Sequence, residues 1–189
     1  VNSSQIPLAK EVNKLLANSG CQTIPKKPQS DAIQKSNYFK TKQRELKNKI
    51  HNFSSKNIDT NMSTKRSLTG IYLEKYDDNN TFIKNPKLKM FNSNLITNIS
   101  SDTAIDPNGE MSEIYLKSNV SVNRKNSSNG SLIILYTSYA IFYLSKDLIE
   151  TDRDVTIITS DSTTTGNGLS ADLDIGLITI LSDAERTIK

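Results

Sequence analysis

Four acidic side chains lie close together in residues 147–154, DLIETDRD, and they are the groups whose types and spacing could do chemistry. Calcium sites need about six to eight converging oxygen ligands, and glycosidases need two carboxyl groups that face each other across a cleft. Nothing in the spacing brings these side chains to one point or sets two of them across a cleft. We therefore interpret the segment as a solvated turn that carries Asp147, Glu150, Asp152 and Asp154.

Histidine, glycine and cysteine give no stronger candidates for a reactive site. His51 is the single histidine and has no recognisable nucleophile context, so neither a hydrolase triad nor a multi-histidine metal site is expected. Gly166-Asn167-Gly168 is not a phosphate loop, because neither a helix nor a Lys follows it. Cys21 is the single cysteine and cannot form an internal disulfide. The sequence predicts no enzyme, no metal and no cofactor.

Alternating side chains predict the strands that must position any functional surface. In residues 111–124, MSEIYLKSNVSVNR, the apolar residues Ile114, Leu116, Val120 and Val122 fall on one face and polar residues fall on the other. The same period of two returns in residues 95–105, 131–144 and 169–181. These segments predict an antiparallel sheet folded over an apolar interior.

Turn signals separate the predicted strands. Asp, Asn, Gly and Pro supply the backbone angles and local hydrogen bonds of turns, and they gather at residues 77–80, 85–86, 106–109, 127–130, 166–168 and 174–176. Such spacing is typical of an all-β sandwich, jelly roll or barrel. A weak repeat of a polar loop and two apolar strands, at about 30 residues, favours a roll of stacked hairpins that is open at both ends.

The net charge of +4 is unevenly distributed along the chain. Residues 1–66 hold 13 Lys and Arg against 4 Asp and Glu, whereas residues 67–189 hold 11 against 16. A nucleic-acid-binding domain would carry positive charge on its folded surface, so this split argues against that class. Residues 1–49 are predicted to be a basic, mostly flexible segment with a short amphipathic helix at residues 7–17, serving as a spacer or as an arm for anionic headgroups.

No stretch of the sequence reaches the ~20 consecutive apolar residues of a membrane-spanning helix. The most apolar run, residues 132–144, is shorter, contains Thr137 and Ser138, and is better explained as a long strand or a strand pair. No secretory signal opens the sequence. Because the sequence begins at Val1, we expect a processed or truncated start.

Six short motifs follow one another in an order that resembles a known family. They are IHNFS at residues 50–54, LTGIYLEKYDD at 68–78, NPKLKMF at 85–91, LKSNVSV at 116–122, ETDRDVTI at 150–157, and TGNGL at 165–169 with the hairpin that follows. Over residues 50–189 the chain resembles the LptC family of lipopolysaccharide export proteins, within the wider LptA/LptC/OstA-like β-jellyroll group. It departs from the family pattern at Lys117-Ser118, at Asp154 and in residues 1–49, where glycine, proline and a transmembrane helix are usual.

This resemblance implies both a fold and a role. The fold would be all-β: an open-ended antiparallel β-jellyroll, a solenoid-like roll of stacked hairpins, at residues 50–189. A largely disordered basic segment would precede it. The protein would be a non-enzymatic part of the lipopolysaccharide transport machinery, in the periplasm and associated with the inner membrane, with an anchor helix not present in this chain. It would hold lipid A acyl chains and pass lipopolysaccharide from an inner-membrane LptB/LptF/LptG-type ABC transporter to an LptA-like bridge protein.

Candidate site residues follow from alternation and from the resemblance. Groove-lining candidates, which could equally be plain core, are Leu116, Val120, Val122, Ile134, Tyr136, Phe142, Ile157, Leu169 and Leu173. Unpaired backbone groups at a sheet edge accept another strand, so edges would join neighbouring proteins. The C-terminal edge, facing the bridge protein, would use Leu177, Thr179, Leu181, Asp183 and Arg186. The N-terminal edge, facing the transporter, would use Phe53, Leu68, Gly70 and Tyr72.

Three other functions remain open at this stage. A soluble bridge protein of the LptA type shares the same motifs and would lack an anchor. A carbohydrate-binding β-sandwich would need a platform of exposed aromatic side chains, and the sequence contains no Trp. A glycan-active enzyme would need a cleft with paired carboxylates.

Overall fold

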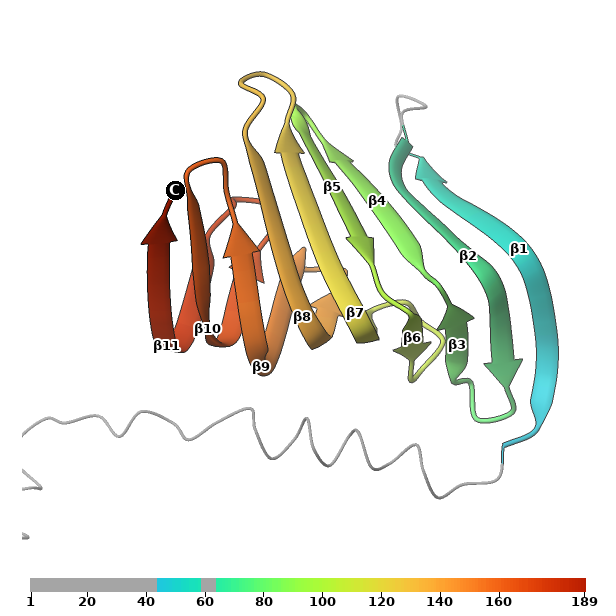
Figure 1. Ribbon diagram of the computed structural model, residues 1–189. Helices are drawn as coiled ribbons and strands as arrows, with labels where there is room; N and C mark the ends of the chain where they lie inside the picture. Colours follow the sequence, from blue (N-terminus) through green and yellow to red (C-terminus); the bar gives the residue numbers. More distant parts are fainter. Residues whose placement is uncertain (1–43, 59–63) are drawn as a thin grey trace, which may run out of the picture.

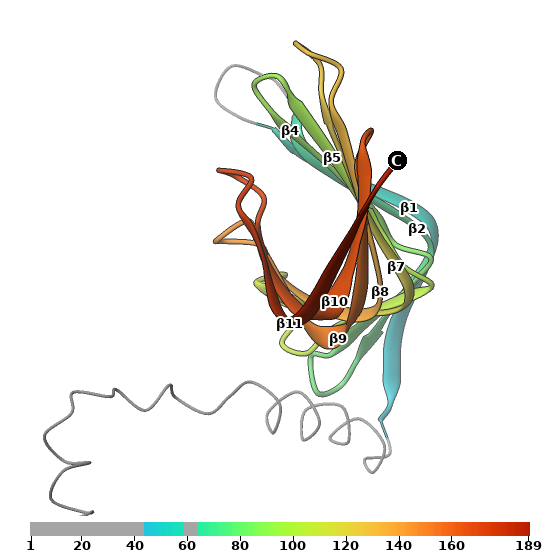
Figure 2. The same ribbon diagram turned by 60° about the vertical axis from the view of Figure 1, so that its left-hand side comes forward.

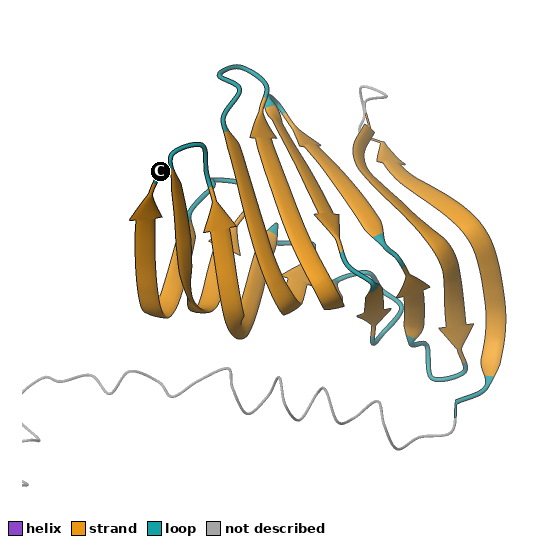
Figure 3. Ribbon diagram, in the orientation of Figure 1, coloured by secondary structure: helices purple, strands orange, loops and turns teal. Residues whose placement is uncertain are grey.

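The computed structural model describes residues 44–58 and 64–189, and the regular structure in these segments is β-strand (Figure 3). Eleven strands form one antiparallel sheet (Figure 1). Their bounds are β1 (Leu46–Ile58), β2 (Thr64–Tyr76), β3 (Thr81–Lys84), β4 (Lys87–Asn92), β5 (Leu95–Ser100), β6 (Thr103–Asp106), β7 (Glu113–Asn126), β8 (Leu132–Tyr143), β9 (Leu148–Ile158), β10 (Ser162–Asp172) and β11 (Ile178–Ile188).

The sheet is largely a meander, but β3 does not pair with β4 and β5 does not pair with β6. The strands β3 and β4 pair with the two halves of β2, and β6 and β5 continue this pairing outward to β7. Together β3 and β4 take the place of one bent strand, and so do β5 and β6. The order then runs through β8, β9 and β10, with β1 and β11 at the two edges.

The strands bend near their middles, and the bends line up across the sheet as a line that we call the crease. Short polar residues and glycine tolerate the positive φ angles found there better than β-branched residues do; they are Asn52, Asn85, Ser118, Asn119, Gly168 and Asp183. The pairing register also shifts at this level in β7–β8, β8–β9, β9–β10 and β10–β11. Polar side chains also pair with each other at the crease. Asn119 Nδ2 on β7 donates a hydrogen bond to Asp102 Oδ2, between β5 and β6, at 2.8 Å.

The crease folds the sheet into two facing walls. We call the half with β4 and β5 the first wall, the half with β3 and β6 the second wall, and the open side between their turns the mouth. The strands β1, β2 and β7 to β11 cross the crease and contribute to both walls. Figure 2 shows the folded sheet with the β4–β5 turn and the β10–β11 turn on opposite sides of the mouth.

Apolar side chains fill the space between the two walls. Alternation sends every second side chain of a strand to the same face, so facing strands bring their apolar sets together. Ile83, Val120 and Phe142 are each 1% exposed or less. Burying a large apolar side chain stabilises the fold by roughly 1.5–3 kcal/mol, so this single cluster is the main source of stability.

The predicted all-β roll is confirmed, and one of the six predicted turns is wrong. Residues 166–168 lie at the crease inside β10, where the positive φ of Gly168 allows a bend rather than a reversal. The other five predicted turns connect strands, although residues 85–86, between β3 and β4, lie at the crease and do not reverse the chain. The predicted helix at residues 7–17, with the rest of the basic segment before residue 44, lies outside the described residues. None of the described segments forms a helix that would reach across a lipid bilayer.

Candidate functional site

The interior between the walls is the candidate site, and most of the predicted groove residues lie in it. Strand β7 is at its centre, since its inward side chains pair on one side with those of β5 and β6 and on the other with those of β8. The predicted groove residues that are 8% exposed or less are Leu116, Val120, Val122, Phe142, Ile157, Leu169 and Leu173. Their contact with a lipid stays a prediction.

The prediction for Ile134 and Tyr136 is wrong, because both lie on the outer face of β8. Tyr136 is 44% exposed, whereas the next residue toward the start of the strand, Leu135, is 3% exposed. In β8 the inward side chains before the crease are Leu135 and Thr137, which pair with Val122 and Val120. The register of β8 against β7 shifts at the crease, so the alternation that places Phe142 inward does not continue to the residues before the crease.

Other inward residues were not among the candidates. The buried side chains of Ile83, Ile99 and Ile149 come from β3, β5 and β9. Strands β3 and β9 are short or interrupted by charged residues, so their alternation is weak in the sequence. A partial signal was present in Val155 and Ile157, which alternate within β9.

Within the part of the chain that the structure describes, a series of cavities follows the interior from its deepest point to the mouth. Two small ones, about 20 Å³ each, lie between the walls; one is lined by apolar side chains, and the other by apolar side chains and Arg124. A cavity of about 400 Å³ lies at the mouth and shares Leu173 with one of the small ones. Another of about 170 Å³ shares Leu68, Leu88 and Ile114 with the second small one. The mouth therefore opens onto the apolar interior at two places.

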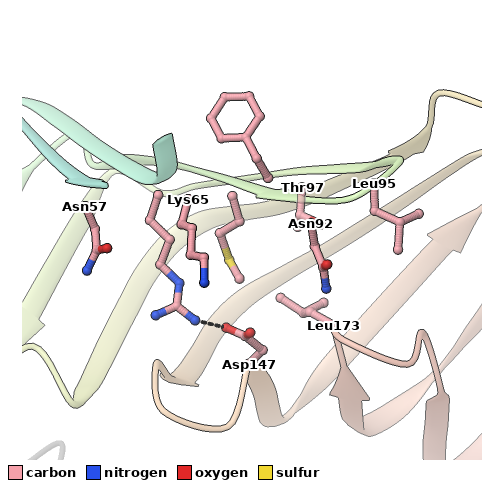
Figure 4. Close-up of a pocket in the computed structure, with 10 residues that line it drawn as sticks. Asn57, Lys65, Asn92, Leu95, Thr97, Asp147 and Leu173 are labelled. Carbon is pink, nitrogen blue, oxygen red and sulfur yellow. Dashed lines mark hydrogen bonds and ion pairs between the residues drawn. The ribbon is translucent and has the colours of Figure 1, made fainter. Parts of the chain in front are cut away.

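The side chain of Arg66 crosses the mouth. Arg66 lies near the start of β2 on the first wall, and its Nη2 donates to Asp147 Oδ1 at 2.5 Å and to the backbone oxygen of Leu144 at 3.1 Å. Both acceptors lie between β8 and β9 on the second wall (Figure 4). Asp147 has a φ of 47°, a turn conformation that Asp and Asn tolerate. The ion pair therefore joins the two walls on the open side.

A second set of contacts crosses the mouth near the C-terminal end of the sheet. Asn92 Nδ2 donates to Asp174 Oδ1 at 2.6 Å, and Arg124 Nη2 lies 3.4 Å from the backbone oxygen of Asp174. The turns of the second wall are themselves joined by a backbone hydrogen bond, from Leu173 N to the oxygen of Asp147 at 2.7 Å. In the part of the chain that the structure describes, the donor of each of these hydrogen bonds across the mouth is a side chain of the first wall.

A family model described as lipopolysaccharide-assembly, LptC-related, matches residues 20–188. The chain belongs to the LptC-related family. The crystal structure of LptH, the LptA-homologous periplasmic component of the lipopolysaccharide transport device from Pseudomonas aeruginosa, is similar in fold, with a TM-score of 0.50 and 6% identity. That match covers 77% of this chain and 96% of LptH. No curated protein matches this chain. Family and fold together support involvement in lipopolysaccharide transport.

The acidic segment of this LptC-related chain is dispersed in the structure. Asp147 faces the mouth, Asp152 lies 3.4 Å from Arg153 Nε, and Asp154 accepts a hydrogen bond from Asn167 Nδ2 at 2.9 Å across to β10. Within residues 44–58 and 64–189, no group of three or more His, Cys, Asp or Glu side chains could hold a metal ion. Asp147, Asp152 and Asp154 each lie beside a different partner, and the carboxylates of this segment do not converge.

The N-terminal edge of the sheet lies one strand further out than predicted. Phe53 is on the edge strand β1, but Leu68, Gly70 and Tyr72 are on β2, which pairs with β1 on one side and with β3 and β4 on the other. The aromatic ring of Phe53 lies over Gly70, where a Cβ would be 2.7 Å from it. The chain after Tyr76 returns as β3, which is why β1 and not β2 is left at the edge.

The C-terminal edge is β11, as expected. Thr179, Leu181, Asp183 and Arg186 lie on this strand, which pairs only with β10 among the described strands, and Leu177 directly precedes it. Leu181 and Leu177 are 56% and 60% exposed. An exposed, apolar edge of this kind is a site where a further strand can add.

Proposed function

We propose that the protein is a non-enzymatic carrier of lipopolysaccharide that holds lipid A acyl chains between its two walls. The observation that carries this proposal is the apolar interior, which runs between the walls and opens at the mouth through the cavity of about 400 Å³. Keeping an acyl chain in water costs roughly 0.8 kcal/mol per CH₂ group, or on the order of 10 kcal/mol for one fatty acid. An apolar interior removes most of that cost, while sugars stay in the solvent.

Acyl chains need the walls to separate. The deepest cavities, at about 20 Å³ each, have room for about one water molecule and are far too small for an acyl chain. The crease supplies a line of Asn, Ser and Gly residues about which the walls can pivot. In the described residues, each hydrogen bond across the mouth involves a side chain, so no backbone pairing would have to break. We propose that lipid enters sideways through the mouth as those contacts break.

The direction of transport would come from the two sheet edges. In this proposal β1 adds to the periplasmic domain of an inner-membrane LptB/LptF/LptG-type transporter, and β11 adds to an LptA-like bridge protein. Pairing of edge strands would extend sheet and interior together, so lipid need not enter water between proteins. The exposed apolar residues Ile50 on β1 and Leu181 on β11 support both contacts.

Photo-crosslinking in transporting cells tests the lipid site. A crosslinking residue at Val122, which is 5% exposed and inward, is expected to form adducts with lipopolysaccharide. The same residue at Ser121, the next position and on the outer face of β7, is the matched control and is expected to form none. If neither position reacts while the protein is folded and expressed, the transport role is wrong and a sugar-binding module becomes the better explanation.

A second crosslinking pair tests the edges and separates the alternative, a soluble bridge protein of the LptA type. A probe at Leu181 should capture the bridge protein, and a probe at Ile50 should capture a transporter subunit. The exposed residue Lys125, on the central strand β7, should capture neither. Capture of bridge protein at both edges would instead favour an LptA-type role, for which the similar fold of LptH is the supporting observation.

A further inference from the structure

The mouth cavity has an amphipathic lining. The cavity of about 400 Å³ is lined by apolar side chains, by two consecutive cationic residues, by uncharged polar side chains and by the carboxylate of Asp147 (Figure 4). The apolar set is Met90, Phe91, Leu95 and Leu173, and the cationic pair is Lys65 and Arg66. Such a lining fits the boundary between an acyl chain and a charged headgroup better than it fits either group alone.

The charge at the mouth differs from that of the rest of the folded body. Residues 67–189 hold 16 Asp and Glu against 11 Lys and Arg, which gives a net charge of −5. At the mouth, Lys65 and Arg66 line the cavity of about 400 Å³ together with one carboxylate, that of Asp147. Release of Asp147 from Arg66 would leave two cations beside an apolar cavity, which is complementary to an anionic amphiphile.

The guanidinium group of Arg66 has further hydrogen-bond donors that could bind such a ligand. Both of its recorded contacts use Nη2, so Nη1 and Nε keep three N–H groups with no acceptor among the described residues. Its side chain is 30% exposed, and that of Asp147 is 25% exposed. Guanidinium groups bind phosphate with two parallel hydrogen bonds, and a phosphate can compete with a single carboxylate for the same site.

We propose that Arg66 binds a phosphate group of a phosphorylated lipid, and that Asp147 is the anion that occupies Arg66 while the mouth is closed. The proposal rests on the lipid-carrier function above and adds the headgroup chemistry and the residue that recognises it. The lipid phosphate exchanges with the Asp147 carboxylate on Arg66, which releases the second wall from the first. Recognition of the headgroup thereby opens the mouth for the acyl chains.

The position of Arg66 between two cavities supports this coupling. Arg66 and Asn57 line both the cavity of about 400 Å³ and the cavity of about 170 Å³. Release of Arg66 from Asp147 and Leu144 would remove the side chain that separates them. The two cavities would then form one groove above Leu68 and Leu88, which also line the interior.

Equilibrium binding by the full chain tests the proposal with three probes: bisphosphorylated lipid A, the same lipid without its phosphates, and inorganic phosphate as a competitor. Arg66→Gln should weaken binding of the phosphorylated lipid about tenfold or more. Asp147→Asn, which keeps a residue type that tolerates the turn, should strengthen it several-fold. Because either change breaks the contact between Arg66 and Asp147 that holds the mouth closed, both should strengthen binding of the dephosphorylated lipid by a similar factor. Arg153→Gln and Asp154→Asn, on the outer face, make the same charge changes and should alter none of these affinities.

The possible outcomes separate this proposal from the carrier function. If wild type binds both lipids but Arg66→Gln does not change its preference, the headgroup site is wrong and the carrier function stands. If wild type binds neither lipid, the carrier function itself fails. If inorganic phosphate binds at Arg66 but phosphorylated lipid is not preferred, the site is a free-phosphate site and the lipid assignment is overturned. Because the two substitutions act in opposite directions, a loss of folding in one variant would not mimic the expected pair of results.

Discussion

Tyr136 and Phe142 lie on the same strand, an even number of residues apart, yet on opposite faces of the sheet. Tyr136 is 44% exposed, whereas Phe142 is 1% exposed. The pairing explains this, because Val120 pairs with Thr137 and Leu116 pairs with Ala140, so the inward residues of β8 change from odd to even numbers across the crease. The crease therefore both bends the strand and changes which residues reach the interior.

We expect Phe142→Ala to destabilise the fold by about 3–5 kcal/mol, because it removes a large side chain from a closely packed interior. Tyr136→Ala, on the outer face of the same strand, should cost far less, about 1 kcal/mol or below. Urea unfolding of the two variants beside wild type measures the difference. Equal losses would mean that the faces of β8 are assigned wrongly.

Asp106 should be a strong structural residue in the β6–β7 loop. Its carboxylate is 1% exposed and accepts backbone hydrogen bonds from Asn108, Gly109 and Met111, at 3.3, 3.0 and 2.9 Å. Asp106→Ala leaves these donors unpaired and should cost about 2–4 kcal/mol. Glu110→Ala, at an exposed position in the same loop, is the control and should change the unfolding free energy by less than about 0.5 kcal/mol. A small effect at both positions would show that water replaces the carboxylate.

Gly109 and Gly130 have nearly the same backbone conformation but different surroundings. Their φ angles are 70° and 73°, and a Cβ at Gly109 would lie 2.7 Å from the backbone oxygen of Asn79, whereas nothing lies within 4 Å of one at Gly130. Gly130→Ala should therefore cost only the strain of the left-handed conformation, about 1–2 kcal/mol. Gly109→Ala must also displace backbone and should cost clearly more in the same unfolding measurement. Equal costs would rule out the close contact with Asn79.

Attachment of β1 should weaken in acid. The hydrogen bond from Lys49 Nζ, at 2.8 Å, lowers the pKa of Glu74 below its ordinary value of 4.5, and the Tyr76 hydroxyl also donates to this carboxylate. A lowered pKa means that the folded state favours the charged form. The stabilisation is therefore complete above pH 4.5 and is lost as the pH falls through the lower, folded-state pKa.

Hydrogen exchange of β1 amides, corrected for the intrinsic effect of pH, measures this loss. Wild-type protection in β1 should fall over that acidic range, relative to protection in β7. Glu74→Gln should lower the protection of β1 at neutral pH and remove the acid-dependent fall. Glu185→Gln, on the opposite edge strand, should leave the β1 profile as in wild type. Identical profiles for wild type and Glu74→Gln would show that the pair with Lys49 does not hold the edge.

Much of the architecture could be predicted from the sequence, because strand alternation is a local property. In β7 the apolar series Ile114, Leu116, Val120 and Val122 is buried throughout, and this could be read directly from residues 111–124. At the crease, two residues of β7 but only one residue of β8 lie between consecutive pairs of the register. The inward residues therefore keep the same parity along β7 and change parity along β8. Alternation was reliable within each half of a strand and failed when it was carried through the bend.

The sequence by itself determined the all-β class, the apolar interior and the family, because local periodicity and motif order need no knowledge of distant contacts. Only the tertiary structure decided which strand is the N-terminal edge and which residues cross the mouth. Arg66 and Asp147 are 81 residues apart in sequence, and no local pattern marks either as a partner of the other. Their contact exists because the crease brings the start of β2, in the first wall, against the turn between β8 and β9 in the second wall, and that geometry is a property of the whole sheet.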